Sequence, residues 1–262
     1  MDLGQLFDVR GKTALVTGGG SGIGMMATEA LVRAGCKVYI ASRRLESCEA
    51  VADELNAEGP GEVIALQADL MTAEGTEQLA AELASREPAL HILVNNSGMT
   101  WGAPLEEFPR SKWDDVFKLN VTAVADLTRL LLPLLKKTGT AEDPARVVNL
   151  GSVVGTRPVS NTAYSYSASK AAVHHLTRIL ANELAASHIT VNAIAPGPFP
   201  SRMMQHITGD ENRRKAMEAG VPLHRVGTPE DIAGVLLMLA SRAGSYITGA
   251  IVPLDGGISA LP

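Results

Sequence analysis

The sequence predicts a single α/β domain in which a doubly wound, parallel sheet of seven strands is flanked by helices on both faces. Seven apolar runs rich in β-branched residues alternate along the chain with stretches of helical spacing. The runs are continuously apolar, as in ALVT, VYIA and ILVN, which is typical of parallel strands buried on both faces. The 262 residues contain no low-complexity linker and no internal repeat, so we expect one domain spanning residues 1–262.

The predicted elements follow one another in a regular order of strand and helix. One helix has an explicit start, because Thr228 can cap it, Pro229 suits its first position and the acidic pair that follows favours the positive end of the helix dipole. From Pro196 to about Pro222, prolines, methionines and a short charged helix interrupt the alternation, and we expect a substrate lid there. The predicted strands are Thr13–Thr17, Lys37–Ala41, Glu62–Leu66, His91–Asn95, Arg146–Leu150, Thr190–Ile194 and Ala250–Leu254.

Composition and charge argue against several classes of function. The 23 basic and 28 acidic side chains give a formal charge of −5, and no basic stripe points to a nucleic-acid partner. No run approaches the roughly 18 apolar residues of a membrane span, and the N-terminus lacks the features of an export signal. The only cysteines, Cys36 and Cys48, form neither a disulfide framework nor a metal clip. We therefore expect a cytoplasmic protein without nucleic-acid or membrane partners.

A glycine-rich turn follows the first predicted strand. The segment TGGGSGIG begins at Thr17 and leads into a helical stretch that Gly35 closes. Glycines allow a tight turn and a close approach to a pyrophosphate, and the amides and dipole of a helix start favour its negative charge. This strand, turn and helix in the right order predict a dinucleotide site. Its candidate residues are Gly18, Gly20, Ser21, Gly22, Ile23 and Gly24.

This turn resembles the T-G-x-x-x-G-x-G turn of the short-chain dehydrogenase/reductase family, and further matches cover nearly the whole chain. The resemblance implies a Rossmann-type domain and a nicotinamide cofactor. The segment NNSG resembles the N-N-A-G of the family, with Ser97 in place of the usual alanine. By the same resemblance, Asp69 and Leu70 contact adenine, Asn96 and Gly98 line the cofactor, Pro196 and Gly197 lie beside the nicotinamide, and Phe199 and Ser201 hold its carboxamide.

The candidate reacting centre follows the fifth predicted strand. Ser152 comes directly after that strand, and Tyr166 and Lys170 are four residues apart, so they share one face of a helix. A carbonyl reductase needs a proton donor for the oxygen that becomes negative, and a free tyrosine, with a pKa of about 10, is a sluggish partner near neutrality. We expect Lys170 to lower the pKa of Tyr166. The resemblance implies that Lys170 also binds the nicotinamide ribose, that Ser152 positions the substrate oxygen, and that Asn120 holds a water that relays protons.

Other candidates have plainer interpretations. Tyr164 has Ala168 four residues later, so we expect it to form a pocket wall rather than to donate a proton. The six histidines lack metal-like spacing, and we expect structural or surface roles for them, including His174, and no metal site. The leucine-rich stretch Leu127–Lys137 suits a core or subunit-contact helix. Because this stretch and the C-terminal strand carry more apolar surface than one sheet needs, we expect a homo-oligomer, most simply a homotetramer.

The cofactor preference is predicted from the residues after the second strand. NAD-binding proteins place an acid there that binds both ribose hydroxyls and repels a 2′-phosphate. Here Ser42 stands at that position, and Arg43 is placed to pair with the phosphate, with Arg44 beside it. We therefore expect NADP(H) to be favoured over NAD(H).

The substrate is predicted to be a ketone or secondary alcohol on a hydrophobic chain. The stretches SGMTWGAPLE, AEDPARVVNLGSVVG and APGPFPSRM resemble the 3-oxoacyl (β-ketoacyl) reductase branch associated with rhamnolipid precursors and, more loosely, gluconate 5-dehydrogenase-like members. Reduction of a 3-oxoacyl group ranks first, and sugar-acid or general alcohol oxidoreduction second. A cofactor-binding regulator without turnover is the third hypothesis. The expected pocket is largely apolar with a polar reacting end and comprises Ser152, Val154, Val159, Tyr166, Pro198, Phe199, Met203 and Met204.

Overall fold

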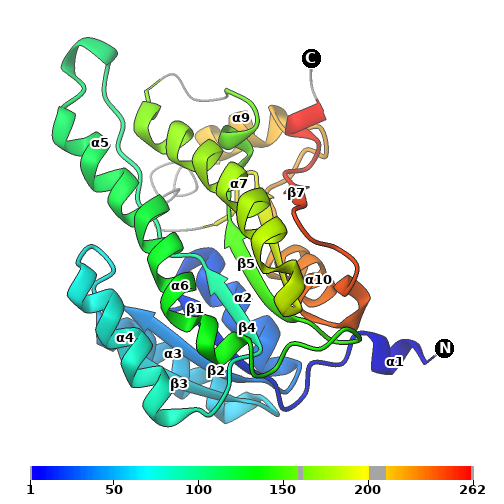
Figure 1. The fold of residues 1–262 in the computed structure, drawn as a ribbon. Coiled ribbons are helices and arrows are strands. Elements are labelled where there is room, and N and C mark those ends of the chain that lie inside the picture. Colours follow the sequence, from blue (N-terminus) through cyan, green and yellow to red (C-terminus); the bar gives the residue numbers. More distant parts are fainter. Residues whose placement is uncertain (1, 159–161, 201–210, 261–262) are drawn as a thin grey trace.

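The computed structural model describes residues 2–158, 162–200 and 211–260. Its centre is one parallel sheet (Figure 1), and the strands follow the order β3-β2-β1-β4-β5-β6-β7. The chain builds outward from β1 to β3 and then returns to pair β4 with β1. Such a reversal opens a crevice at the carboxyl ends of the strands, where doubly wound folds bind their ligands. The strands are β1 (Thr13–Thr17), β2 (Lys37–Ser42), β3 (Glu62–Gln67), β4 (Ile92–Asn95), β5 (Ala145–Leu150), β6 (Ile189–Pro196) and β7 (Ile251–Leu254).

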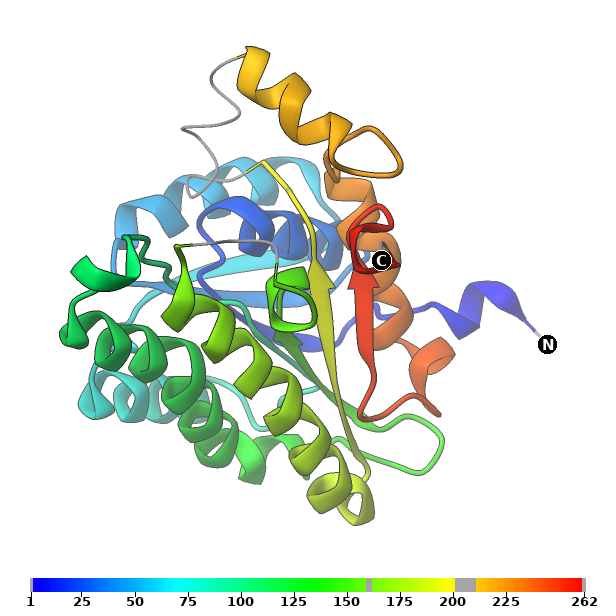
Figure 2. The same ribbon diagram turned by 90° about the horizontal axis from the view of Figure 1, so that it is seen from above.

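Helices cover both faces of the sheet and bury a separate apolar core on each side (Figures 1 and 2). One core joins the sheet to α2 (Gly22–Arg33), α3 (Leu45–Glu58) and α10 (Pro229–Ala240). The other joins it to α4 (Ala73–Arg86), α6 (Ala123–Leu135) and α7 (Tyr164–Leu184). These two layers explain why the strand runs are continuously apolar, since β1, β4, β5 and β6 are buried along their whole lengths.

The predicted strands are all confirmed, with ends that shift by one or two residues. The predicted start of α10 is also confirmed, because a capping box joins Thr228 and Asp231, with Pro229 at the first helical position. The glycine that closes α2, Gly35, has a φ of +85°, a left-handed conformation that favours glycine.

The remaining helices lie outside the two layers. Within the part of the chain that the structure describes, they are α1 (Leu3–Leu6), α5 (Arg110–Phe117) and α9 (Glu211–Ala219). A π-helical turn, Lys118–Thr122, joins α5 to α6. In Figure 2, α9 stands apart from both helical layers. Of the expected excursion between Pro196 and Pro222, the structure describes residues 196–200 and 211–222, which include α9, and residues 201–210 lie outside the described residues. The described part of the chain contains no helix long and apolar enough to cross a membrane.

Candidate active site

A cavity of about 1080 Å³ opens where the carboxyl ends of the central strands meet. It is lined by the glycine turn, by the segments that follow β2, β3, β4, β5 and β6, and by α7 and α9. The turn after β1 and the Ser152 loop after β5 therefore face one continuous space. This is the crevice that the strand order predicts for a dinucleotide and its reaction partner.

The glycine turn has the backbone that a pyrophosphate site requires. Gly18 and Gly22 have φ values of +68° and +55°, and the Gly18 N–H donates to the Ala41 carbonyl at 2.7 Å. Ser21 precedes α2 without capping it through its side chain, so the first amides of the helix have no side-chain cap to compete with an anion. Gly18, Gly20, Ser21, Gly22 and Ile23 line the cavity, and these residues fit a bound pyrophosphate.

Two predicted cofactor residues act behind the turn. Gly24 does not line the cavity. It lies against the backbone of Gly18, where a Cβ would collide with the Gly18 carbonyl oxygen, so its role is to let α2 pack closely against the turn. Asn96 donates from Nδ2 to the carbonyl oxygens of Thr17 (2.8 Å) and Gly18 (3.3 Å). The Thr17 hydroxyl accepts from the Asn96 and Ser97 amides at 3.0 and 2.9 Å. The NNSG segment thus braces the glycine turn, and Asn96, Ser97 and Gly98 also line the cavity.

The end of the cavity beyond β2 and β3 carries the predicted phosphate-selecting residues. Ser42, Arg43 and Arg44 line it, and both arginines are exposed. The Ser42 hydroxyl donates to the Arg44 carbonyl at 2.8 Å, which fixes the backbone between the two arginines. Asp69 and Leu70 line the same end. Ser47, near the start of α3, was missed by the sequence analysis, because only the fold brings that helix turn against Gly20.

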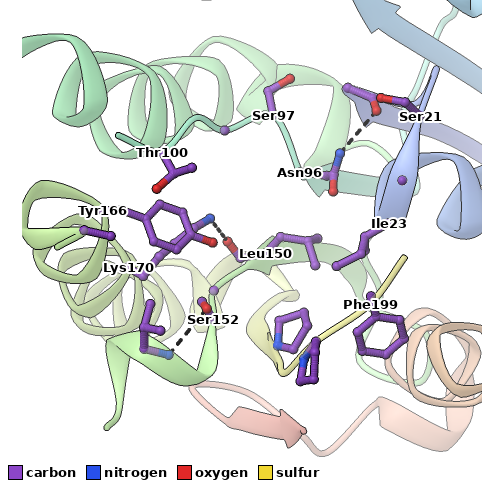
Figure 3. A pocket seen from close by; sticks show the side chains of 18 of the residues that line it. Ser21, Ile23, Asn96, Ser97, Thr100, Leu150, Ser152, Tyr166, Lys170 and Phe199 are labelled. Carbon is purple, nitrogen blue, oxygen red and sulfur yellow. Dashed lines mark hydrogen bonds between the residues drawn. The ribbon is translucent and has the colours of Figure 1, made fainter. Parts of the chain in front are cut away.

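The predicted catalytic triplet meets in the cavity. Ser152, Tyr166 and Lys170 all line it, although they come from the loop after β5 and from α7 (Figure 3). Lys170 Nζ donates to the Leu150 carbonyl at 2.6 Å and lies 5.6 Å from the centroid of the Tyr166 ring. Ser152 is extended, and its Oγ accepts from the Val154 N–H at 3.4 Å. The lysine therefore ties α7 to the end of β5.

The electrostatics of this triplet differ from the sequence-based expectation in one respect. Burial raises the pKa of Tyr166, and a hydrogen bond with Ser152 opposes this rise only in part. Burial also lowers the pKa of Lys170 to about 8. The expected lowering of the tyrosine pKa is thus not found, because desolvation disfavours the phenolate and is the largest cause of the shift. In this structure the phenol is protonated at neutral pH.

Asn120 lies behind the cavity wall rather than on it. Its side chain is 1% exposed and sits in the π-helical turn between α5 and α6. Its Oδ1 accepts from the Met99 N–H at 2.9 Å, and its Nδ2 donates to the Met99 carbonyl and to Ser169 Oγ, each at 3.0 Å. A Cβ on Gly98 would lie 3.3 Å from Asn120 Oδ1 and 3.7 Å from Lys170 Nζ. Asn120 therefore joins the loop after β4 to α7, at Ser169, the residue before Lys170.

The remaining wall comes from segments far apart in the sequence. Val154, Pro198 and Phe199 line the cavity as predicted, and Pro196 and Gly197 lie on its wall as well. Val159, Ser201, Met203 and Met204 fall outside the described residues. Some apolar wall residues were not predicted individually, because their contact depends on tertiary placement; they include Met217, Val221 and Ile258.

One further sequence-based expectation, a place for Tyr164 on the pocket wall, has a plain outcome. Tyr164 is not part of the cavity wall, and its ring packs edge-on against Phe108, with 5.5 Å between the centroids. The wall role expected for it is therefore wrong, because the start of α7 turns this side chain toward α5. Across residues 2–158, 162–200 and 211–260, no group of three or more His, Cys, Asp or Glu side chains is placed to hold a metal ion.

A Rossmann-type sheet, a glycine turn and a Ser-Tyr-Lys triplet in one cavity define a nicotinamide-dependent oxidoreductase. A family model described as enoyl-(acyl carrier protein) reductase matches residues 18–259. The chain belongs to the short-chain dehydrogenase/reductase family and is an enzyme of that family.

Among its relatives, the rhamnolipids biosynthesis 3-oxoacyl-[acyl-carrier-protein] reductase of Pseudomonas aeruginosa is 47% identical over 251 residues, which cover 96% of this chain and 97% of that protein. The active-site complex of Pseudomonas aeruginosa RhlG with NADP superposes with a TM-score of 0.93 at 46% identity and covers 97% of this chain and 99% of that chain. The 2-dehydro-3-deoxy-D-gluconate 5-dehydrogenase of Bacillus subtilis is 35% identical over 256 residues, 97% of each protein.

Proposed function

We propose that this protein is an NADPH-dependent reductase that converts a 3-oxoacyl thioester to the 3-hydroxyacyl product. The observation that carries the proposal is the joining of three features in one cavity: arginines beyond β2, the Ser152-Tyr166-Lys170 triplet, and an apolar wall that includes Met217, Val221 and Ile258. The similarity to a 3-oxoacyl-[acyl-carrier-protein] reductase and to an NADP complex supports it.

The residues of the cavity account for the two ends of the cofactor. The glycine turn and the first amides of α2 would hold the pyrophosphate. Gly18, Gly20 and Gly22 line the cavity and have no side chains, so a pyrophosphate can approach their backbone closely. Arg43 and Arg44 would pair with the 2′-phosphate. When bound, NADPH supplies the hydride that the carbonyl carbon receives.

The chain itself supplies the proton and positions the carbonyl. A tyrosine with its usual pKa of about 10 is protonated at neutral pH, and burial raises the pKa of Tyr166 further, so its phenol can give a proton to the oxygen that becomes negative. This protonation state suits the reductive direction. Ser152 would donate a hydrogen bond to the same oxygen, and the positive charge of Lys170 would stabilise the tyrosinate that remains. We propose for Asn120 the role of holding a water near Lys170, because Asn120 Oδ1 and Lys170 Nζ both lie within 4 Å of the position that a Cβ on Gly98 would take.

A second candidate is a dehydrogenase for sugar acids or other alcohols. The similarity to 2-dehydro-3-deoxy-D-gluconate 5-dehydrogenase favours it, as do the hydroxyls of Thr100 and Thr162 on the cavity wall. The apolar residues of α9 and the C-terminal segment favour an acyl chain instead, because burial of its methylene groups would contribute about 0.8 kcal/mol each. A regulator without turnover would have no need of the intact Ser152, Tyr166 and Lys170 arrangement.

The experiment that tests the proposal is a substrate panel followed by nicotinamide absorbance. Purified enzyme with NADPH is supplied with a 3-oxoacyl thioester, a keto-sugar acid and a quinone, and the reactions are repeated with NADH. We expect the highest kcat/KM with NADPH and the 3-oxoacyl thioester. A preference for the keto-sugar acid would support the second candidate, and no oxidation of NADPH by any compound would support a regulator.

We also propose that the protein is a homotetramer of the cytoplasm. Several large apolar side chains are exposed, among them Trp113 on α5 and Ile179 on α7, and such surface suits subunit contacts. Both cysteines are free and buried, which suits a reducing compartment. Light scattering should give about four times the 27.5 kDa of one chain. A mass of one chain at micromolar concentration would contradict the proposal.

A further inference from the structure

His174 packs against the loop that follows β5 and carries Ser152, although it does not line the cavity. It is 4% exposed and sits on α7 four residues after Lys170, so both side chains leave the same face of the helix. Its Nε2 accepts from the Ser152 N–H at 3.4 Å, and its Nδ1 lies 3.5 Å from Thr156 Oγ1. The ring therefore contacts both ends of the loop that carries Ser152.

The loop is shaped to receive this ring. A Cβ on Gly151 would collide with His174 Nε2, and a Cβ on Gly155 would lie 2.9 Å from His174 Cε1. Glycines thus stand on both sides of Ser152 where the imidazole approaches the backbone. Since Lys170 Nζ holds the Leu150 carbonyl at 2.6 Å, α7 ties down the loop at two successive points.

The ring has the protonation state that this contact needs. Burial lowers the pKa of His174 to about 4, with smaller contributions from Lys170 and Arg178, so the imidazole is neutral near pH 7. Acceptance of the Ser152 N–H by Nε2 then requires the proton to be on Nδ1, where it can be donated to Thr156 Oγ1. Among the described residues, His174 is the one acceptor that the buried Ser152 N–H has.

We propose that His174 is a positioning residue, which fixes the Ser152 hydroxyl relative to Tyr166 and Lys170 by accepting the Ser152 N–H. Loss of the acceptor leaves a buried donor unpaired, and the loop must shift to find another partner. A shift of the Ser152 hydroxyl acts on the chemical step, whereas the NADPH phosphates are held elsewhere. The inference rests on the carbonyl-reductase function proposed above.

The test compares three substitutions at this position. In His174→Leu the acceptor is removed, in His174→Asn the polar side chain is too short to replace Nε2, and in His174→Gln an amide oxygen can reach the Nε2 position. His175→Leu is the matched control, because His175 is the exposed neighbour. We expect kcat to fall about tenfold or more in His174→Leu and His174→Asn, with the KM for NADPH changed less than about twofold. His174→Gln and His175→Leu should stay within about threefold of wild type.

A second readout separates this inference from the proposed function. Amide hydrogen exchange of the peptide spanning residues 150–156 should be faster in His174→Leu and His174→Asn than in wild type and His174→Gln, whether or not the substrate is known. Unchanged exchange in both variants would overturn the inference. So would wild-type kcat in His174→Leu or His174→Asn, or a kcat in His174→Gln as low as theirs. Failure of wild type to oxidise NADPH with any compound of the panel would overturn the proposed function alone.

Discussion

Replacement of Arg43 by alanine should reduce the preference for NADPH over NADH by about tenfold and leave the NADH reaction unchanged. A charge-assisted pair between a guanidinium and a phosphate is worth about 1.5 to 3 kcal/mol. Arg43 and Arg44 are both exposed, so solvent screens the pair and the lower end of this range applies. About 1.4 kcal/mol corresponds to a factor of ten in kcat/KM.

Arg44 lines the same end of the cavity and retains part of the preference when Arg43 is absent. Removal of both arginines should therefore cost about 3 kcal/mol, or about 100-fold in the preference. Substitution of Ser42 by Asp would add a repelling carboxylate, but it would also remove the hydroxyl that donates to the Arg44 carbonyl. The charge deletion is consequently the cleaner change.

The assay is kcat/KM with each cofactor at fixed ionic strength, for wild type, Arg43→Ala and the double variant Arg43→Ala/Arg44→Ala. Arg242→Ala is the control, because Arg242 is exposed and lies away from the cavity. Addition of salt to about 0.5 M should reduce the wild-type preference and have little effect on the double variant. A wild type that prefers NADH, or a double variant that keeps its NADPH preference, would refute the assignment.

Three other outcomes follow from the structure. Lys170→Met should lower kcat by about 10²-fold and raise the Kd for NADPH. The wild-type Kd, measured by fluorescence titration, should also rise above pH 8, because the lysine, with its pKa of about 8, loses its charge there. A Kd that is unchanged by the substitution and by the pH would contradict the cofactor role of Lys170. Gly18→Ala should weaken NADPH binding about tenfold, because Gly18 has a φ of +68° and a Cβ there would lie 2.8 Å from Asn96 Nδ2. Gly11→Ala is the control, because Gly11 has a comparable φ of +74° and a Cβ there would meet nothing within 4 Å, so the Kd for NADPH should stay unchanged. An equal loss of binding in both variants would argue against a cofactor effect. Between pH 6.5 and pH 4, the free energy of unfolding should fall by up to about 3 kcal/mol more in wild type than in His174→Gln. The reason is that the pKa of His174 is lowered from 6.5 to about 4 in the folded protein, so on acidification the unfolded chain binds the proton first. An equal fall in the two proteins, measured by urea unfolding at the two pH values, would contradict this.

The sheet and the cofactor half of the site could be predicted because their signals are local. Continuous apolar runs mark strands buried on both faces, and TGGGSGIG is contiguous in the chain. Tyr166 and Lys170 are related by one helical turn, so their common face also follows from spacing alone.

What could not be predicted depends on tertiary placement. Met217 reaches the cavity from the expected lid segment, where the sequence did not single it out, and Ile258 reaches it from a segment that no motif marks. Tyr164 packs against Phe108, a contact between residues far apart in the sequence. The pKa shift of Tyr166 was expected in the wrong direction, since the spacing to Lys170 indicates a charge nearby but says nothing of burial. His174 was expected to have only a structural or surface role, because its contact with Ser152 arises only when the loop after β5 folds onto α7.

The most direct test of the proposed mechanism is Tyr166→Phe, measured with NADPH and a 3-oxoacyl thioester. The substitution removes only the phenolic oxygen from a cavity residue, so kcat should fall by about 10²-fold or more while the Kd for NADPH changes less than about twofold. Tyr164→Phe is the matched control, because that ring packs against Phe108 and should keep wild-type turnover. Turnover retained in Tyr166→Phe, or lost equally in Tyr164→Phe, would contradict the assignment of Tyr166 as the proton donor.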